Sequence, residues 1–340
     1  MTEATTEPIL QARDLKVRFN APGGRLARAV DGVNLDLRAG EILALAGESG
    51  CGKTTLARTL LGLERPTEGT VSYQGTPLRY STKALKAHRS AVQLVLQDPT
   101  GALNPRHTVY DAVAEGLRIH GIAGNERDRV AEALSRAGLR PPEKFFLTYP
   151  HELSGGQRQR VVIAGALVLN PQVIIADEPV ASLDASVRGE ILALLLRLRD
   201  ELGLSAVVVT HDLGLAWNIA DRIAVMYLGR VVEDGPVDEV LIDPQHPYTR
   251  ALVSVLPNST IGEPIVLAGE PPDATRVPHG CRFHPRCHIL AQGAAEDAGV
   301  ADGCRHTDLP ILDSHAQRQV ACHYVHARAG EKHPIEPAAS

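Results

Sequence analysis

One segment constrains the fold of this chain more than any other, because residues 47–54 have the sequence Gly-Glu-Ser-Gly-Cys-Gly-Lys-Thr. This matches the GxxxxGK[ST] pattern of a phosphate-binding loop, or P-loop. A short apolar run, residues 41–46, precedes the loop, and a helical pattern, residues 53–61, follows it. Glycines let the backbone N–H groups of such a loop turn toward phosphate oxygens at the positive end of a helix. The segment therefore predicts a strand, a P-loop and a helix in that order, with a nucleotide bound between them.

The next strong motif is Leu-Ser-Gly-Gly-Gln at residues 153–157, which opens a helix predicted at 155–169. A helix N-terminus binds anions, because its first N–H groups and the helix dipole favour negative charge. The same pattern also fits an ordinary helix start with Ser154 as the N-cap. Both interpretations hold together, since capping and phosphate contact use the same orientation of the backbone donors.

Two adjacent carboxylates follow a buried strand predicted at residues 173–176. Alone, a pair such as Asp177 and Glu178 is more often a solvated strand end. Behind a P-loop the pair has a sharper interpretation, in which Asp177 holds Mg²⁺ and Glu178 polarises the attacking water. Lys53 is then expected to reach the β- and γ-phosphates, and Thr54 to ligate Mg²⁺.

Alternating strand and helix patterns predict the α/β fold class, with a parallel sheet between layers of helices. Two further strands, at residues 9–19 and 30–37, predict an antiparallel N-terminal β-subdomain. Helical patterns over about 99–168 indicate a helical subdomain inserted into the main sheet. We therefore place the main domain at residues 1–242, a loop-rich extension at 243–328 and a disordered tail at 329–340.

Four of the five cysteines lie in the predicted extension: Cys281, Cys287, Cys304 and Cys322. Few apolar residues surround them and several histidines lie among them, which predicts a small region held together by a metal. The spacing lacks the CxxC pairs of most zinc ribbons, so zinc and an iron–sulfur cluster both stay open. The alternative is a set of unrelated surface thiols.

Composition argues against several classes of protein. The net charge is −5 and no run of lysine or arginine stands out, which disfavours a nucleic-acid partner. No apolar stretch approaches the roughly 18–20 residues that span a bilayer, so membrane association is expected to depend on partner proteins. The N-terminus has no signal-peptide pattern, so we expect a reducing compartment without disulfides.

The order of these motifs resembles the ATP-binding-cassette (ABC) ATPases. The resemblance implies that the signature loop, residues 153–157, completes the nucleotide site of a second subunit. The residues then expected to act on the partner's ATP are Ser154, Gly155, Gly156, Gln157 and Asp184. The resemblance also implies that His211 contacts the γ-phosphate, and that Gln97 senses Mg²⁺ and water and links the site to the helical subdomain.

The ATP site expected in this chain combines the P-loop with the ends of neighbouring strands. Its residues are Phe19, Gly47, Ser49, Gly50, Cys51, Gly52, Lys53, Thr54, Thr55, Gln97 and His211. Phe19 is the best aromatic for stacking on adenine, and a core position at a strand end explains it equally well. Mg²⁺ is expected on Thr54, Gln97 and Asp177. Hydrolysis is expected to depend on Lys53, Gln97, Glu178 and His211.

Further segments narrow the resemblance to the ATPase subunits of bacterial oligopeptide, dipeptide and nickel importers. They are Gln-Asp-Pro at 97–99, Leu-Asn-Pro-Arg at 103–106, His-Pro-Tyr-Thr at 246–249 and Gly-Cys-Arg-Phe at 280–283. The implied partners are a second, paralogous ATPase, two permeases and an extracytoplasmic substrate-binding protein, with this chain at the cytoplasmic face of the membrane. Some members carry a [4Fe-4S] cluster in this region, so the resemblance favours iron–sulfur over zinc at the four cysteines.

The expected function is therefore ATP hydrolysis that drives uptake of di- or oligopeptides. Nickel or another small solute stays open, because the sequence does not name the imported solute. A soluble ABC-type ATPase that acts on nucleic acid or ribosomes is a second class, and the single cassette without basic runs disfavours it. A redox sensor with vestigial ATPase activity is a third, and the complete motif set argues against it.

Overall fold

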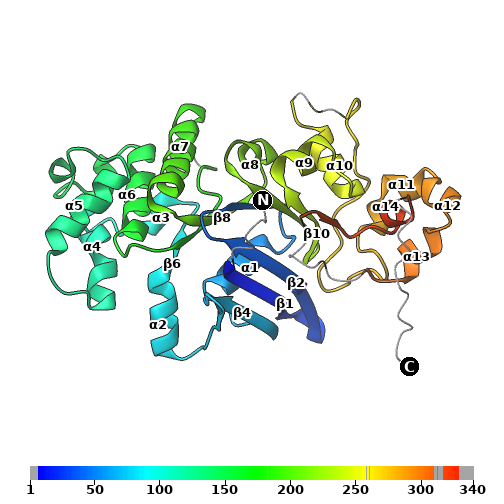
Figure 1. Ribbon diagram of the computed structural model, residues 1–340, viewed down its shortest axis with the longest axis horizontal. Coiled ribbons are helices and arrows are strands. Elements are labelled where there is room, and N and C mark those ends of the chain that lie inside the picture. The colour runs from blue at the N-terminus through cyan, green and yellow to red at the C-terminus, as the bar shows by residue number, and fades with distance from the viewer. Residues whose placement is uncertain are drawn as a thin grey trace, which may run out of the picture.

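The computed structural model describes residues 7–181, 183–257, 259, 261–309, 312 and 317–328. The tail predicted to be disordered, residues 329–340, lies outside the described residues. Two sheets occupy the centre of the molecule, with one group of helices at one end and the short helices of the extension at the other (Figure 1). The predicted α/β fold class is confirmed, including the inserted helices and the antiparallel N-terminal strands.

Within the described residues, the main sheet has the strand order β11-β10-β9-β3-β8-β7-β6. Strands β6, β7, β8, β3 and β9 are parallel, and β10 and β11 pair antiparallel at one edge. The carboxyl ends of the parallel strands meet at one edge of the sheet, where α/β proteins bind ligands. The strand bounds are β3 (Ile42–Ala46), β6 (Val92–Val95), β7 (Val173–Asp177), β8 (Ser205–Thr210), β9 (Arg222–Tyr227), β10 (Arg230–Pro236) and β11 (Gln319–Val320).

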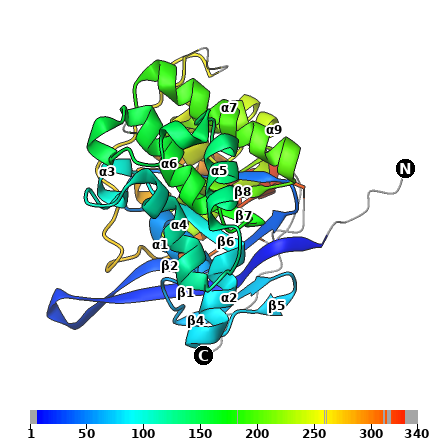
Figure 2. The ribbon, with the colours of Figure 1, turned by 90° about the vertical axis from the view of Figure 1, so that its left-hand side faces the viewer.

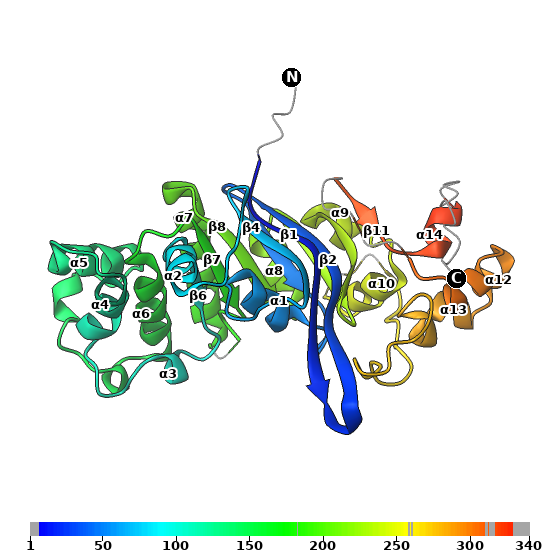
Figure 3. The same ribbon diagram turned by 90° about the horizontal axis from the view of Figure 1, so that it is seen from below.

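The second sheet is antiparallel and has the order β2-β1-β4-β5 in the described chain. Its strands are β1 (Pro8–Ala21), β2 (Arg25–Arg38), β4 (Glu68–Tyr73) and β5 (Thr76–Pro77). A 3₁₀ turn, Pro22–Gly24, joins β1 to β2, as the Pro-Gly-Gly sequence predicts. The far end of this hairpin extends beyond the body of the molecule (Figures 2 and 3).

Helix α1 (Lys53–Leu60) follows the P-loop and packs against strands of both sheets. The inserted helices are α3 (Pro99–Ala102), α4 (Val109–His120), α5 (Glu126–Arg136) and α6 (Gly155–Leu167). Those outside the insertion are α2 (Thr82–Ala91), α7 (Ala185–Leu202), α8 (Leu213–Ile219), α9 (Val237–Ile242) and α10 (Pro247–Ser254). In the extension they are α11 (His288–Ala291), α12 (Ala294–Asp297), α13 (Ala301–His306) and α14 (His323–Arg328). Among the described helices, none is long and apolar enough to cross a membrane.

Strand β3 divides the core into two layers, because successive side chains of a strand point to opposite faces. Ile42, Ala44 and Ala46 join the apolar cluster that includes the inserted helices. Leu43 and Leu45 join the second cluster, which includes α1 and the N-terminal sheet. Both faces of the strand are buried, so it reads as one continuous apolar run that ends at the P-loop.

The extension is tied to the main sheet, which the prediction of a loop-rich appendage did not include. Strand β11 pairs with β10, with Val320 opposite Glu233 and Gln319 opposite Asp234. The N–H of Ala321 donates to the carbonyl of Val232 at 2.8 Å. Cys322, one of the four clustered cysteines, follows directly and is held near the sheet edge.

Candidate active site

The P-loop connects β3 to α1 and takes a shape that only glycine permits at two positions. Gly47 has φ +148° and Gly52 has φ +110°, both in the region that L side chains rarely adopt. A Cβ at Gly47 would strike the carbonyl oxygen of Met226, and one at Gly52 would strike that of Ala29. The loop therefore packs its backbone against β9 and β2, which leaves its other side open.

Lys53 begins α1 and is nearly buried, with 6% of its surface exposed. Its Nζ donates to the carbonyl oxygens of Gly47 at 2.7 Å and Glu48 at 2.9 Å. These bonds tie the start of α1 to the first two residues of the loop, and Nζ also lies 3.9 Å from Cys51 Sγ. This places a fixed positive charge inside the loop.

The two predicted carboxylates lie at the end of β7 and take different positions. Thr54 Oγ1 donates to Asp177 Oδ1 at 3.5 Å, and burial raises the pKa of Asp177. Glu178 has φ +46°, and its N–H donates to the carbonyl of Val209 at 2.9 Å. Glu178 Oε1 lies 2.7 Å from His211 Nδ1. The end of β7 thus pairs one acid with the P-loop threonine and the other with the histidine after β8.

Lys53, Thr54, Glu178 and His211 face one cavity of about 590 Å³, and Asp177 lies behind Thr54 without lining it. The predicted residues that line it are Ser49, Gly50, Gly52, Lys53, Thr54, Thr55, Gln97, Glu178 and His211. Two residues that sequence reasoning missed, Ala29 and Ala274, line it as well. The N–H of Arg28 donates to the carbonyl of Ala274 at 3.0 Å, which joins β2 to the extension at the rim. No sequence signal marks either alanine, since their place depends on where distant segments meet.

Phe19 is not among the residues that line this cavity. It lies in β1 opposite Ala27 of β2, and 39% of its surface is exposed. Gly47 and Cys51 belong to the P-loop itself, where Cys51 is buried with 6% of its surface exposed. The role of Phe19 in adenine stacking stays a prediction.

Comparison with known proteins identifies the family. A family model described as ABC transporter matches residues 30–181, and one described as Oligopeptide/dipeptide transporter, C-terminal region, matches residues 232–293. The Dipeptide transport ATP-binding protein DppF of Escherichia coli is 45% identical over 84% of this chain and 88% of its own. The chain belongs to the ABC transporter ATPases of the oligopeptide/dipeptide family. The Putative oligopeptide transport ATP-binding protein YkfD of Bacillus subtilis is 42% identical over 96% of this chain and 98% of its own.

Solved cassettes support the same fold for this ABC ATPase. The structure of cbiO1 from Clostridium perfringens superposes with a TM-score of 0.63 at 34% identity, over 70% of this chain and 92% of that one. The dimeric bacterial ABC transporter cassette MJ0796 superposes with a TM-score of 0.60 at 32% identity, over 67% of this chain and 98% of that one. The enzyme assignment as an ATPase follows from these matches and the cavity above.

The signature loop of this ABC ATPase forms a capped helix start. Ser154 Oγ accepts from the N–H of Gln157 at 3.2 Å, and Gln157 Oε1 accepts from the N–H of Ser154 at 3.0 Å. This capping box fixes the first turn of α6. None of Ser154, Gly155, Gly156 and Gln157 is among the described residues that line the P-loop cavity. Asp184 is the N-cap of α7.

The four cysteines of the extension line a second, small cavity, the cysteine cavity: Cys281, Cys287, Cys304 and Cys322. Burial raises the pKa of Cys281 and Cys322 to about 12 and that of Cys304 to about 11. All four are free thiols rather than disulfides. In the described residues no group of three or more His, Cys, Asp and Glu side chains could hold a metal ion as placed.

This arrangement bears on the two metals that the sequence left open. Zinc is tetrahedral with four close thiolates or imidazoles, and the described residues do not present such a group. A [4Fe-4S] cluster takes one thiolate at each of four irons, so its ligands stand farther apart around a larger group. The four thiols line a cavity of only about 10 Å³ and burial raises the pKa of Cys281, so the described residues as placed do not enclose a cluster either.

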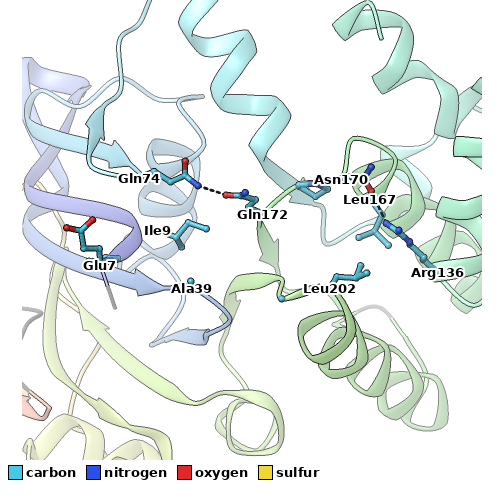
Figure 4. Close-up of a pocket in the computed structure, with 12 residues that line it drawn as sticks. Glu7, Ile9, Ala39, Gln74, Arg136, Leu167, Asn170, Gln172 and Leu202 are labelled. Carbon is cyan, nitrogen blue, oxygen red and sulfur yellow. Dashed lines mark hydrogen bonds between the residues drawn. The ribbon is translucent and has the colours of Figure 1, made fainter. Parts of the chain in front are cut away.

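A larger cavity, of about 660 Å³, lies at the opposite edge of the main sheet (Figure 4). Gln172 and Gly203, which line it, precede β7 and β8, so it faces away from the P-loop. Its polar groups are engaged with one another: Gln74 Nε2 donates to Gln172 Oε1 at 2.6 Å, and Arg136 donates to Asn170 Oδ1 at 2.8 Å. It holds none of the motif residues, so the smaller P-loop cavity is the candidate active site.

Proposed function

We propose that this chain is the ATP-hydrolysing subunit of an importer that takes up di- or oligopeptides. The observation that carries this proposal is the single cavity that gathers Lys53, Thr54, Gln97, Glu178 and His211 from four separate elements or loops. Relatives named for dipeptide and oligopeptide transport over nearly their whole length support the choice of solute. The chain would act at the cytoplasmic face of the membrane, attached through two permeases that receive solute from an extracytoplasmic binding protein.

Each residue of the cavity has a distinct task in phosphoryl transfer to water. Lys53 and the P-loop N–H groups bind and orient the phosphates of ATP. Thr54, Asp177 and Gln97 would hold Mg²⁺, which supplies positive charge between phosphate oxygens. Their fit rests on the contact of Thr54 Oγ1 with Asp177 Oδ1 at 3.5 Å. Glu178 accepts the proton of the attacking water, and His211 fixes the carboxylate through its 2.7 Å contact.

The signature loop would serve the ATP of a second, paralogous ATPase subunit. Ser154, Gly155 and Gly156 form an exposed or half-buried helix start away from this chain's own P-loop cavity, where the N–H groups of the two glycines can face a neighbour. Asp184 begins α7 beside the same loop. Two ATP molecules would then be held between two cassettes, so that binding closes the pair and hydrolysis opens it.

The cysteine cavity would hold a [4Fe-4S] cluster, and zinc is the alternative. The support is the all-sulfur donor set around one cavity. The full chain is purified without oxygen, and its visible absorbance, iron and acid-labile sulfide are measured. A cluster predicts iron and sulfide in equal amounts and a broad visible band, both lost in Cys281→Ser. Zinc without a visible band would contradict the cluster.

Uptake measurements test the proposed function. Cells in which this chain carries Lys53→Ala are expected to lose uptake of a radiolabelled dipeptide, because the substitution removes the amine that binds phosphate. Uptake of nickel is expected to be unchanged. The control is Glu190→Gln, which alters an exposed carboxylate paired with Arg160. Unchanged dipeptide uptake would contradict the proposal, and loss of nickel uptake alone would identify the other solute.

A further inference from the structure

Glu48, the second residue of the P-loop, is held by the extension at two points. Arg286 donates to its carboxylate twice, from Nη1 at 2.7 Å and from Nη2 at 3.2 Å. The N–H of Glu48 donates to the hydroxyl of Tyr248 at 2.8 Å. The carbonyl of Glu48 accepts from Lys53 Nζ, so the residue that the extension holds also positions the phosphate-binding amine.

The Arg286 side chain is enclosed and strongly oriented. Only 6% of the side chain is exposed, against 27% for Glu48. Its Nε donates to the carbonyl of Ala268 at 3.3 Å, and its guanidinium lies 5.9 Å from the ring centre of Tyr227. A two-pronged, partly desolvated pair of this kind fixes both direction and distance. The geometry is therefore a rigid brace from the extension to the P-loop.

The brace begins at the cysteine cavity. Arg286 is followed directly by Cys287, which lines that cavity. Phe283 lines it too, and its ring packs 5.2 Å from Tyr227 and 5.5 Å from Tyr248, the two aromatics that contact the brace and Glu48. All three aromatic side chains are fully buried, so displacement at one is transmitted to the others.

A second set of contacts starts at the residue after Cys281, another cysteine that lines the cavity. Arg282, which follows Cys281, donates to the carbonyl of Leu228 at 2.6 Å and pairs with the buried Asp31. The next residue, Gly229, donates its N–H to the carbonyl of Cys51 in the P-loop at 2.8 Å. Two arginines beside two cysteines thus reach the same loop, one directly and one through the turn between β9 and β10.

We infer that Arg286 is a positioning residue of the P-loop, and that through it the state of the cysteine cavity changes the affinity for ATP. Without Arg286, the Glu48 carboxylate loses its counter-charge beside the site that takes a triphosphate, and repulsion follows. Because Arg286 directly precedes Cys287, a change at the cysteine cavity displaces the segment that carries Arg286. The inference rests on the proposed function only in that the P-loop binds ATP.

The first experiment is a calorimetric titration of the full chain, purified without oxygen, with a non-hydrolysable ATP analogue and Mg²⁺. Arg286→Gln is expected to weaken binding by about tenfold, within the usual range of coupling between sites. Arg286→Lys restores part of the affinity, and Glu48→Gln in the Arg286→Gln chain restores part as well, because it removes the unpaired charge. The matched control is Arg305→Gln, an exposed arginine of the extension paired with Glu296.

Steady-state ATPase measurements separate positioning from general loss of structure. Arg286→Gln is expected to raise KM for ATP by the same factor while kcat stays within about twofold, the pattern of lost uniform binding. Affinity equal to that of the control would overturn the inference. A fall in kcat that matches a fall in the unfolding midpoint would also overturn the inference, because both would then report a general loss of structure. If the unsubstituted chain bound no ATP, the proposed function would fail instead.

The second experiment tests the link to the cysteines. Cys287→Ser, or Cys287→Ala where that variant does not fold, is expected to weaken ATP binding. In the Arg286→Gln chain the same substitution is expected to have little further effect, because the brace is already missing. Equal losses in both backgrounds, or no loss in either, would show that the cysteine cavity does not act through Arg286.

Discussion

Replacement of Glu178 by Gln tests the chemistry at the end of β7 most directly. Gln has the same shape as Glu, and its amide can keep a hydrogen bond to His211, which lies 2.7 Å from the carboxylate. The backbone of Glu178 is held independently by its N–H bond to Val209. The substitution therefore removes one negative charge and one proton acceptor and leaves the shape of the cavity unchanged.

The expected loss follows from the role of that acceptor. A positioned general base typically contributes 10²–10⁴-fold, or about 3–5 kcal/mol of the activation barrier. Since Lys53 and the P-loop N–H groups bind the phosphates without Glu178, ATP affinity should stay the same or increase as repulsion from the carboxylate disappears. We expect kcat to fall by at least about a hundredfold with ATP bound, and a closed pair of cassettes to accumulate.

Phosphate release measures turnover, calorimetry measures ATP affinity, and size-exclusion chromatography with ATP measures the closed pair. Glu190→Gln serves as the matched control, because that carboxylate is 63% exposed and lies on α7 away from the cavity. If Glu178→Gln kept turnover within about threefold of the unsubstituted chain, far less than a general base contributes, Glu178 would not be the base.

Three further predictions concern the loop, the extension and pH. Gly52→Ala should abolish ATP binding, because the added Cβ would strike the backbone carbonyl of Ala29. The control is Gly40→Ala, which also has positive φ but has open space around the added Cβ. It should lower the free energy of unfolding by only about 1–2 kcal/mol and leave ATP affinity unchanged. Arg282→Ala should cost about 3 kcal/mol in urea unfolding, because the buried Asp31 then keeps only its longer, 3.5 Å contact with the exposed Arg28. Replacement of the exposed Arg305 by Ala should cost less than about 1 kcal/mol. Burial lowers the pKa of His88 below 6.5, so the imidazole takes up a proton more readily in the unfolded chain than in the folded chain. The free energy of unfolding should therefore decline as pH falls below 6.5. Urea unfolding measured across pH should show a shallower decline in His88→Gln.

The candidate site was largely predictable because parallel strands bring their carboxyl ends to one edge. The P-loop follows β3, Glu178 follows β7 and His211 follows β8, and these three strands are neighbours in the order β3-β8-β7. A motif after each strand is thus enough to predict from the sequence alone that Lys53, Glu178 and His211 lie together. The same reasoning gave the buried, continuous apolar strands and the inserted helices.

Phe19 shows where this reasoning ends. Its aromatic ring made it the best candidate for adenine stacking, yet its distance from the P-loop depends on the length and direction of the β1–β2 hairpin. That hairpin has several register shifts and projects from the body, so no local pattern fixes where residue 19 stands (Figure 3). The four cysteines pose the related problem that spacing along the chain does not give sulfur geometry. The structure gathers them at one cavity without forming a group that could hold a single ion.

The extension was the least predictable part, because its role depends on pairs that are very distant in sequence. Arg286 and Glu48 are 238 residues apart, and Arg282 and Asp31 are 251 apart. From the sequence alone, each of these residues is indistinguishable from an ordinary surface charge. Folding brings the two arginines into buried positions, where Arg282 pairs with Asp31 and Arg286 with Glu48. The change in amino-acid composition near residue 243 therefore does not mark the limit of the active site. The P-loop of this ATPase is completed by residues that follow that point, since Tyr248 and Arg286 hold Glu48 and Ala274 lines the cavity.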